Sequence, residues 1–499
     1  MQILNKILSY LKKILSPISL LWGKINDKAQ TSIIIFTLCV LFIAIGYSYI
    51  EYEYYAYAFI PIVLLALLIY YYKLDKVLYL ITLLTPLSIN MLVNENTVMT
   101  LPTEPLLILF TLAFALKTLI DESYDFRILK HPITLAIFFY LFWMLITSLT
   151  SVRPMVSIKY FVSKILYIIP FFLATIPLFA KFKNIKIMYL SYAVALVVVV
   201  MYASIGFALK GFEFDYSFYI MQPFYNDHTA YGAILAMFLT MTSYFLLSKT
   251  TTIKGKLFYF TLFAIFLMGL ILSYSRAAWL SVLPAIGIYL ILKFKIKFKL
   301  ILAILITGLF LFFAFQTSIL QILEKNSQDS SGNIAEHISS ISNISTDASN
   351  VERLNRWFCA FRMFEEKPFF GWGPGTYQFE YAGYQKSYQL STISTNAGIL
   401  GNAHSEYFGA LADSGVFGML SVIILFSVVI YTGIKVYKRA QDKTEGKLAI
   451  FITMSLVTYY THGILNNFLD TDKLSVPFWF FTAAIVALDL YTKKKEKIQ

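Results

Sequence analysis

A single histidine, His404, has the sequence surroundings of a proton acceptor. It follows Asn402, a residue type that favours helix N-caps, and it begins a long apolar run. The partial positive charge of a helix N-terminus disfavours a protonated imidazole, so we expect a neutral side chain that accepts a proton at pH 7. The same helix end attracts anions, phosphate included. The alternative is a histidine that anchors a helix at an interface, and the sequence leaves both interpretations open.

Three arginines have positions suited to phosphate oxygens. Arg276 lies between two apolar runs that almost no loop separates. A guanidinium placed there costs free energy unless it has a partner or reaches water, and its planar fork suits phosphate. Arg353 and Arg356 are three residues apart, so they share a helix face and could clamp a diphosphate. Alternatively, Arg276 reaches toward the lipid headgroups, and Arg353 and Arg356 lie on a solvent-exposed helix face.

Further polar residues flank the apolar runs on the same side. Lys159 is predicted as another diphosphate ligand, and the predicted supporting residues are Asp227, His228, Glu406 and Asp413. Glu406 and Asp413 are seven positions apart, so they share a helix face. His462 and Asp470 mark the outer end of another span. Taken singly, each of these residues is more often an interfacial or buried polar residue.

The chain shows no spacing typical of metal ligands. Cys39 and Cys359 are far apart in the sequence and suggest neither a disulfide framework nor a zinc site. No close group of Asp, Glu and His has the pattern of a divalent-cation site. We therefore predict no metal and no cofactor, and we expect Arg and Lys to neutralise an anionic substrate.

The composition places these residues in a membrane protein. Of 499 residues, 58% are hydrophobic and only 14% are charged, against roughly 25% charged in a soluble domain. This excludes an ordinary soluble globule and a disordered chain. Pro86 and Asn90 could break one of the apolar runs, and the 403–434 run is too long for one simple span. The runs long enough to cross a bilayer lie at residues 31–50, 54–72, 76–92, 101–120, 131–150, 158–180, 186–208, 228–248, 257–275, 277–293, 298–316, 403–434, 448–469 and 475–492.

The positive charges predict the orientation of the spans. The net charge is +13, and 29 of the 41 Lys and Arg residues lie in alternate connections, so that every second loop is basic. The positive-inside rule then puts both termini in the cytoplasm and the 317–402 segment outside. Because these charges set orientation, we predict the lipid bilayer as a partner and no nucleic acid.

The predicted fold is an all-α polytopic membrane protein with about 12–14 transmembrane helices and one large outer loop that contains amphipathic helices. In that loop an apolar stripe at helical spacing predicts a helix over 347–366 that covers the membrane face. The stripe consists of Val351, Leu354, Phe358, Phe361 and Phe364. Pro368 and the glycine-rich run 371–375 should end the helix in a turn. The expected divisions are an amphipathic cytoplasmic segment at 1–30, about eleven spans in 31–316, the loop at 317–402, about three spans in 403–492 and a basic tail at 493–499.

Three motifs, in this order, resemble signatures of the bacterial O-antigen ligase and polymerase superfamily. Residues 275–280 resemble its earlier arginine motif. Residues 353–357, followed by 368–373, resemble the start of its large periplasmic loop. Residues 402–407, continuing through 412–418, resemble its histidine-containing signature. The resemblance covers residues 220–480 by motif, and the departures are a long N-terminal lead and two spans beyond the twelve usual for ligases.

The resemblance implies a multi-span (GT-C-like) glycosyltransferase of the bacterial inner membrane, with its active site facing the periplasm. The implied donor is a glycan linked to undecaprenyl diphosphate, and the implied transfer is metal-independent and inverting. In ligases the acceptor is a sugar hydroxyl of lipid A–core, whereas in polymerases it is a second lipid-linked glycan. A related branch transfers the glycan to protein Ser or Thr. The motif positions imply catalytic roles for His404 and Arg276 and diphosphate binding by Arg276 with Arg353 or Arg356.

Two other classes of function stay open at this point. A polysaccharide transporter or lipid flippase would also have many spans. The large outer loop and the absence of repeated halves argue against it. A purely structural subunit of polysaccharide assembly is the third reading.

Overall fold

Long apolar helices make up most of the described chain, as the composition predicts. The computed structural model describes residues 73–94, 97–120, 124–297, 299–300, 303, 306–307, 348–390, 394 and 401–493. The amphipathic N-terminal segment, the spans predicted at 31–50 and 54–72, and most of the span at 298–316 lie outside these residues. So do the first part of the outer loop and most of the basic tail.

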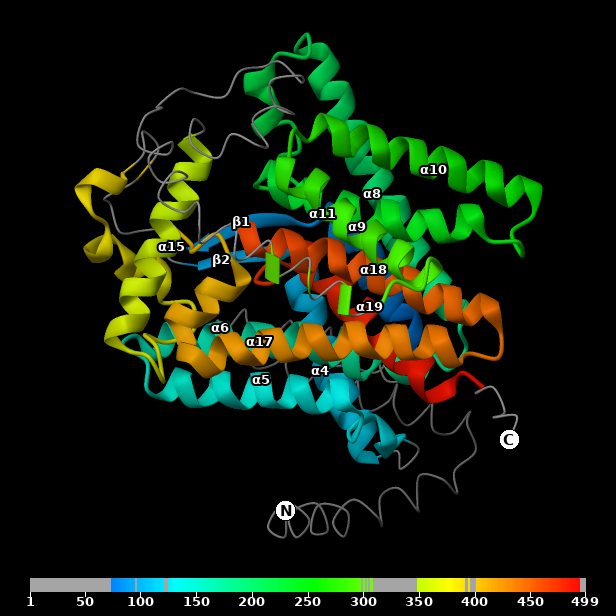
Figure 1. Cartoon of the computed structure of the whole chain (residues 1–499), viewed down its shortest axis with the longest axis horizontal. Helices are drawn as coiled ribbons and strands as arrows, with labels where there is room; N and C mark the ends of the chain where they lie inside the picture. Colours follow the sequence, from blue (N-terminus) through cyan, green and yellow to red (C-terminus); the bar gives the residue numbers. More distant parts are fainter. Residues whose placement is uncertain are drawn as a thin grey trace, which may run out of the picture. The chain divides into compact units, whose positions relative to one another are not determined.

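The described residues fall into two units, which are treated separately. The described residues between Met1 and Ile81 and those between Thr103 and Phe126 form one unit. The described residues between Thr82 and Pro102 and those between Arg127 and Gln499 form the other. The first contributes helical residues 73–81 and α4 (Thr103–Ile120). The second contains every residue of the candidate site (Figure 1).

The second unit consists of helices joined by short connections. Its helices are α5 (Pro132–Leu149), α6 (Pro154–Ile168), α7 (Thr175–Leu178), α8 (Lys183–Leu209), α9 (His228–Leu247), α10 (Ile253–Leu272), α11 (Arg276–Lys293), α15 (Ala348–Glu366), α16 (Tyr377–Glu380), α17 (Glu406–Arg439), α18 (Lys443–Leu465) and α19 (Asp472–Tyr491). Short 3-10 turns occur at η2 (Thr85–Leu87), η5 (Phe214–Phe218), η6 (Tyr381–Tyr384) and η7 (Ser387–Gln389), and a π-helical turn, η4 (Ile169–Leu173), joins α6 to α7.

Nine helical segments of the described chain are long and apolar enough to cross a membrane: α5, α6 through α7, α8, α9, α10, α11, α17, α18 and α19. Each matches a run predicted from the sequence. Large apolar side chains such as Phe142, Val198 and Phe260 stay exposed on their outer faces, which suits contact with lipid. The all-α polytopic membrane fold is confirmed.

The apolar run at 76–92 does not form one span and is broken, as Pro86 and Asn90 suggested. The helix that begins at residue 73 ends at residue 84, before Pro86, which cannot donate a backbone hydrogen bond. The chain then forms an antiparallel hairpin of β1 (Ile89–Asn94) and β2 (Thr97–Leu101), with Met91 paired to Met99. The 76–92 run is therefore α-helix up to residue 84, a 3-10 turn at Thr85–Leu87 and strand from Ile89.

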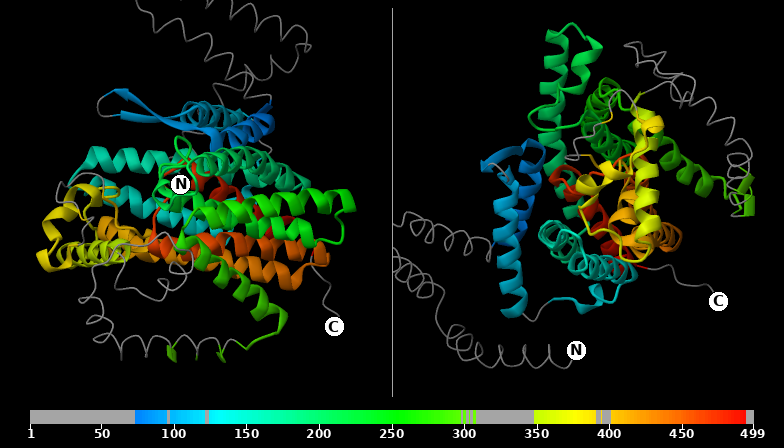
Figure 2. Two further views of the ribbon diagram at one scale, coloured as in Figure 1. Left: turned by 90° about the horizontal axis from the view of Figure 1, so that it is seen from above. Right: turned by 90° about the vertical axis from the view of Figure 1, so that its left-hand side faces the viewer.

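Three helices form the interior of the second unit. In α9, α18 and α19 the most apolar stretch is 83% buried, against at most 44% in the other spans. The two further views place α18 and α19 among the other helices (Figure 2). Because these helices are apolar on all sides, they are stable only when other helices surround them. Their ends are therefore fixed positions on which a site can be built.

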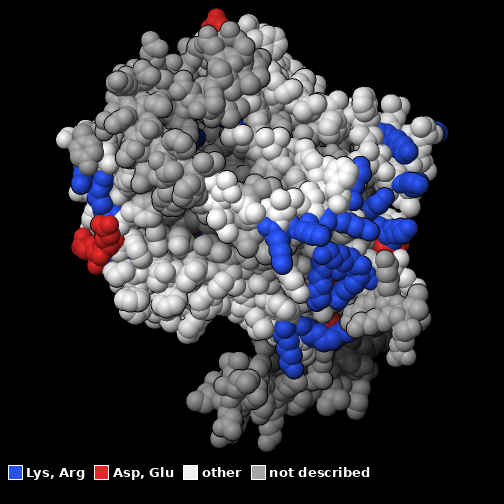
Figure 3. All heavy atoms as spheres, in the orientation of Figure 1, with Lys and Arg blue, Asp and Glu red and all other residues white. Residues whose placement is uncertain are grey.

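The basic side chains gather at one end of the helices. Figure 3 shows Lys and Arg over the ends of α10, α17 and α18 that lie farthest from α15. Lys438 and Arg439 in the last turn of α17 belong to this end. The loops that are predicted to be basic from the sequence therefore place many of their Lys and Arg side chains at the same end of the helices.

Helix α17 is broken at Gly415, as the length of the 403–434 run suggests. Gly415 has φ 69°, a backbone conformation that glycine adopts without strain. The turn that follows α15 packs against the break. Trp372 N–H donates to the Ala412 carbonyl (3.1 Å), and Gly373 N–H donates to the Asp413 carbonyl (2.7 Å). The hydrogen bonds lost at the break are thus replaced by the glycine-rich turn.

The helix predicted over 347–366 is present as α15, but its buried face differs from the predicted one. The apolar stripe is only half buried, and Phe361 is exposed. The buried face consists of Glu352, Asn355, Arg356, Cys359, Ala360 and Met363. Polar residues can occupy this face because Arg356 and Glu352 form an ion pair (2.5 Å) and the Arg356 guanidinium lies 3.8 Å from the centre of the Tyr381 ring.

Candidate functional site

The ends of several helices opposite the basic end meet around a group of polar side chains. Asp227 caps α9 by accepting a hydrogen bond from Thr229 N–H (2.6 Å), which places His228 at the first position of the helix. His228 Nδ1 lies 2.9 Å from the carbonyl oxygen of Ser273, at the end of α10. Because a carbonyl oxygen only accepts, Nδ1 carries the proton and Nε2 is the acceptor of the neutral ring.

The tight turn between α10 and α11 places Arg276 near His228. Tyr274 adopts φ 49° in this turn, and the Ser275 hydroxyl caps α11 by accepting from Ala278 N–H (3.4 Å). A side chain at Gly232 of α9 would overlap Ser275, so the two helices approach closely here. Arg276 is consequently half buried and is one of the charged neighbours of His228.

The two arginines of α15 are held differently. Arg353 Nε donates to the carbonyl oxygen of Leu465 (3.2 Å), the last residue of α18. Arg356 is buried in its pair with Glu352. The sequence predicted that the two arginines act as one clamp, but they have separate partners: Arg353 contacts the end of α18, and Arg356 is bound to Glu352 within α15.

His404 lies in the loop that precedes α17. Its backbone adopts φ 46°, and its N–H donates to Asn402 Oδ1 (3.0 Å). The cap of α17 is Ser405, whose hydroxyl accepts from Tyr407 N–H and Phe408 N–H (both 3.3 Å). The expectation that Asn402 caps the helix is thus wrong, because His404 has a conformation that a helix cannot include.

The surroundings of His404 keep its imidazole neutral. Burial is the main cause, followed by the positive charges of Arg353 and Arg356; together they lower the pKa of His404 to about 4. Asp227 and Glu352 oppose this shift. His404, His228 and His462 share two charged neighbours, Arg353 and Asp227. Residues from α9, α11, α15, α18 and the 404 loop therefore form one cluster.

His462, which was not among the predicted site residues, belongs to this cluster. It is fully buried in the last turns of α18, and its Nε2 lies 3.2 Å from Asn466 Nδ2. Its charged neighbours include Arg353, Asp227 and His228. The sequence did indicate that His462 and Asn466 lie close together, since they are four positions apart at the end of a span. The proximity of His462 to Arg353, however, depends on the fold.

Three residues predicted for the site lie elsewhere. Lys159 is exposed on α6 and is not among the principal charged neighbours of the clustered histidines. Glu406 Oε1 accepts from Phe468 N–H (2.9 Å), and its other donors are Leu469 N–H and the Tyr459 hydroxyl. Asp413 accepts from backbone N–H groups of the glycine-rich turn, among them Gly375 (2.8 Å). Both carboxylates therefore fix backbone segments.

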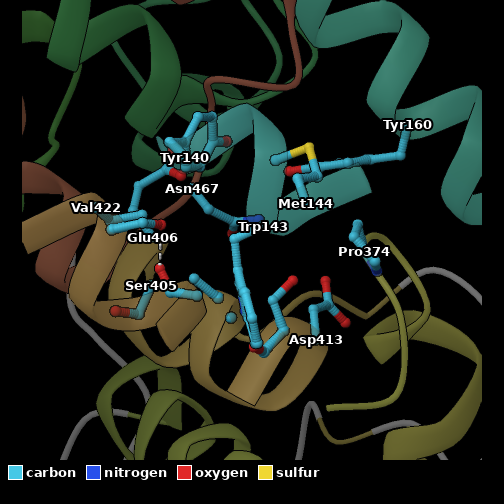
Figure 4. A pocket seen from close by; sticks show the side chains of 15 residues that line it. Tyr140, Trp143, Met144, Tyr160, Pro374, Ser405, Glu406, Asp413, Val422 and Asn467 are labelled. Atoms are coloured by element: carbon cyan, nitrogen blue, oxygen red, sulfur yellow. Dashed lines mark hydrogen bonds between the residues drawn. The ribbon is translucent and has the colours of Figure 1, made fainter. Parts of the chain in front are cut away.

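Glu406 and Asp413 also line a cavity, together with Ser405, the residue after His404. This cavity, called here the α5–α17 cavity, has a volume of about 60 Å³, with empty space of about 530 Å³ once its mouth is included (Figure 4). Its polar and aromatic lining comes from α5, α6, α17 and the loop after α18: Tyr140, Trp143, Tyr160, Glu406, Asp413 and Asn467. Buried Lys164 lies close by, with Nζ 2.5 Å from the carbonyl oxygen of Leu469.

The chemistry available to the cluster follows from its charges. Arg276 and Arg353 can supply charged donors to the oxygens of an anion in a half-buried place, where such hydrogen bonds are strong. The neutral His404 ring next to Arg353 can accept a proton. Within the described residues, no three His, Cys, Asp or Glu side chains are grouped so that they could hold a metal ion.

A comparison with protein families identifies the central part of the chain. Residues 261–423 match the family model described as O-antigen ligase. This stretch is about a third of the chain and runs from within α10 into α17. It contains Arg276, Arg353 and His404, whereas His228 and His462 lie on either side of it. No curated protein sequence matches the chain.

Proposed function

Because the chain carries a domain of the O-antigen ligase and polymerase superfamily, we propose that it transfers a glycan from undecaprenyl diphosphate to a sugar hydroxyl of an acceptor glycolipid. The observation that supports this most directly is the grouping of Arg276, Arg353 and His404 at one end of the helices. These residues come from sequence positions far apart, and each lies within the part that matches the family.

The proposed role of Arg276 and Arg353 is to bind the diphosphate of the donor. Departure of the lipid diphosphate places negative charge on its leaving oxygen, and fixed guanidinium groups stabilise that charge in the transition state. Arg356 is already bound to Glu352, so its part is to hold α15 in place. Lys159, exposed on α6, is better suited to lipid headgroups than to this diphosphate.

His404 is proposed as the general base. The acceptor oxygen forms a bond to the anomeric carbon of the donor sugar while the bond from that carbon to the diphosphate oxygen breaks. The electron pair leaves with the lipid diphosphate, and the hydroxyl proton passes to His404 and then to water. General-base assistance of this kind contributes about 10²–10⁴-fold.

Donor binding should itself make His404 a better base. The free protein holds the pKa of His404 at about 4, partly through the charge of Arg353. A bound diphosphate brings negative charge next to that guanidinium, so it raises the pKa of His404 toward its ordinary value of roughly 6.5, where general bases act well at pH 7. The base would then be effective only when the donor is in place.

The proposed site faces the periplasm. The cluster lies at the ends of α9, α11 and α18 opposite the basic ends. If basic loops stay in the cytoplasm, the cluster is outside, where lipid-linked glycans present their sugars. The proposed location is the inner membrane, with both termini cytoplasmic.

The test is a transfer assay in proteoliposomes with a lipid-linked glycan donor and a glycolipid acceptor. The His404→Ala variant should lose about 10²-fold or more in kcat, whereas His337→Ala, a histidine change within the predicted 317–402 loop, should keep the wild-type rate. Undiminished transfer by well-expressed His404→Ala protein would exclude an essential base. A glycolipid that crosses the vesicle membrane without a new glycosidic bond would instead indicate a flippase.

A polymerase is the second candidate, since the matched family does not distinguish the two acceptors. The glycolipids of a deletion strain separate them. Loss of a ligase leaves long lipid-linked polymer, whereas loss of a polymerase leaves single repeat units attached to lipid.

A further inference from the structure

The α5–α17 cavity contains a buried acceptor that lacks a donor. Asn467 Oδ1 is buried, and among the described residues no group donates a hydrogen bond to it. A buried polar atom in this state costs free energy, and native proteins rarely keep one without a reason. Asn467 lines the cavity together with Tyr140 and Glu406 (Figure 4). A ligand hydroxyl or amide N–H would supply the missing donor.

The charge of the lining selects against anions. Glu406 and Asp413 both lie on the cavity wall, and Lys164 is the buried cation close to Glu406. Both carboxylates already accept hydrogen bonds from backbone N–H groups, which fixes them in place. A phosphate or carboxylate of a ligand would face two fixed acceptors, so the cavity suits an uncharged group that donates hydrogen bonds.

The size of the cavity limits what enters it. A volume of about 60 Å³ holds a few water molecules, so only part of a sugar ring fits inside, with the rest in the wider mouth. Aromatic side chains, Tyr140, Trp143 and Tyr160, supply apolar surface beside the polar atoms. Polar groups set among aromatic walls are a common arrangement in small-molecule sites.

The position of the cavity relative to the arginines indicates which substrate it serves. His404 has Arg353 as a charged neighbour, and the next two residues, Ser405 and Glu406, line the cavity. An inverting displacement needs the acceptor on the face of the anomeric carbon opposite the leaving diphosphate. We infer that the α5–α17 cavity binds the hydroxyl edge of an uncharged sugar residue of the acceptor. This inference rests on the proposed function, which places the diphosphate at the arginines.

Steady-state kinetics provide the first test, with the Tyr140→Phe and Asn467→Ala variants. Tyr202→Phe is the matched control, because Tyr202 is exposed on α8, away from the cavity lining. We expect the acceptor KM to rise about tenfold in both cavity variants, with the donor KM and kcat nearly unchanged. The thermal midpoint of Asn467→Ala should not fall, since the lost oxygen has no protein partner. An unchanged acceptor KM, or a fall in stability with no kinetic change, would overturn the inference.

A binding experiment separates this inference from the proposed function. Saturation-transfer NMR on the full chain in detergent would use methyl glycosides of glucose, galactose and N-acetylglucosamine, with methyl glucuronide as the anionic comparison. Binding of an uncharged glycoside that survives His404→Ala and is lost in Asn467→Ala supports the cavity even if transfer is never observed. Equal signals from wild type and Asn467→Ala, or preferential binding of the glucuronide, would refute it even if transfer proceeds.

Discussion

The guanidinium of Arg353 adds to the effect of burial in keeping the imidazole of His404 unprotonated. Burial is the larger cause, and the charge of Arg353 is the next largest; together with Arg356 they hold the pKa of His404 at about 4. Arg353 is itself held by the Leu465 carbonyl oxygen at the end of α18. The proton affinity of the candidate base is therefore coupled to the charge of a candidate phosphate ligand.

Replacing Arg353 should raise the pKa of His404. The Arg353→Gln change removes a positive charge that disfavours the imidazolium, so the pKa moves up from about 4 toward its ordinary value of roughly 6.5. Diethyl pyrocarbonate reacts with the unprotonated ring, and peptide mass spectrometry reports the reaction at His404 alone. At a pH between these two values, the variant should react more slowly than wild type. Lys159→Gln, which removes an exposed charge, is the control, and equal reactivity in all three proteins would refute the coupling.

Arg276→Lys tests the need for a planar fork. Lysine keeps the charge but loses the two parallel donors that match phosphate oxygens. We expect kcat/KM for transfer to fall roughly 10–100-fold, with normal membrane insertion and thermal stability. A wild-type rate would show that a point charge is sufficient at the start of α11.

Gly415→Ala should destabilise the contact between the glycine-rich turn and α17. Gly415 has φ 69°, and a Cβ there would overlap the Phe369 carbonyl oxygen. We expect a loss of about 2–4 kcal/mol in stability, seen as a lower thermal midpoint in detergent. Gly287→Ala is the matched control, because Gly287 lies in α11 with open space around it; this change should be neutral or stabilising by up to about 1 kcal/mol. Equal midpoints for the two variants would contradict the packing described here.

The Glu352 and Arg356 pair should be strongly coupled. Both side chains are buried and lie 2.5 Å apart, so removing one partner leaves an uncompensated charge, at a cost of about 3–5 kcal/mol. The double change Glu352→Gln with Arg356→Met should cost less than either single change. Additive losses in a double-mutant cycle would show that the pair contributes nothing beyond its separate contacts.

Much of the fold follows from local sequence patterns. The nine spans match predicted runs because span length and basic loops are properties of short segments. The hairpin at 89–101 was missed, since apolar strands and apolar helices have the same composition over ten residues. The sequence also predicted the wrong buried face for α15. The face that is buried is polar, and its burial depends on the ion pair of Arg356 with Glu352 and on the contact of Arg356 with the Tyr381 ring.

The candidate site was predictable only in part. Arg276, Arg353 and His404 have recognisable motifs, and their grouping supports the roles proposed for them. Glu406 and Asp413 accept hydrogen bonds from backbone segments 36–63 positions away. These bonds depend on tertiary packing, so the spacing of the two residues along one helix could not predict them. The α5–α17 cavity exists only where five segments meet, and no pattern along the chain predicts such a meeting.

The hydrogen bond between Arg353 and Leu465 joins positions that are 112 residues apart. During biosynthesis the ribosome makes α15 well before α18, so the arginine lacks this acceptor until the later helix has been translated and inserted. The same delay applies to His462, which approaches Arg353 from α18. The order of translation thus makes the cluster around Arg353 one of the last parts of the molecule to be completed.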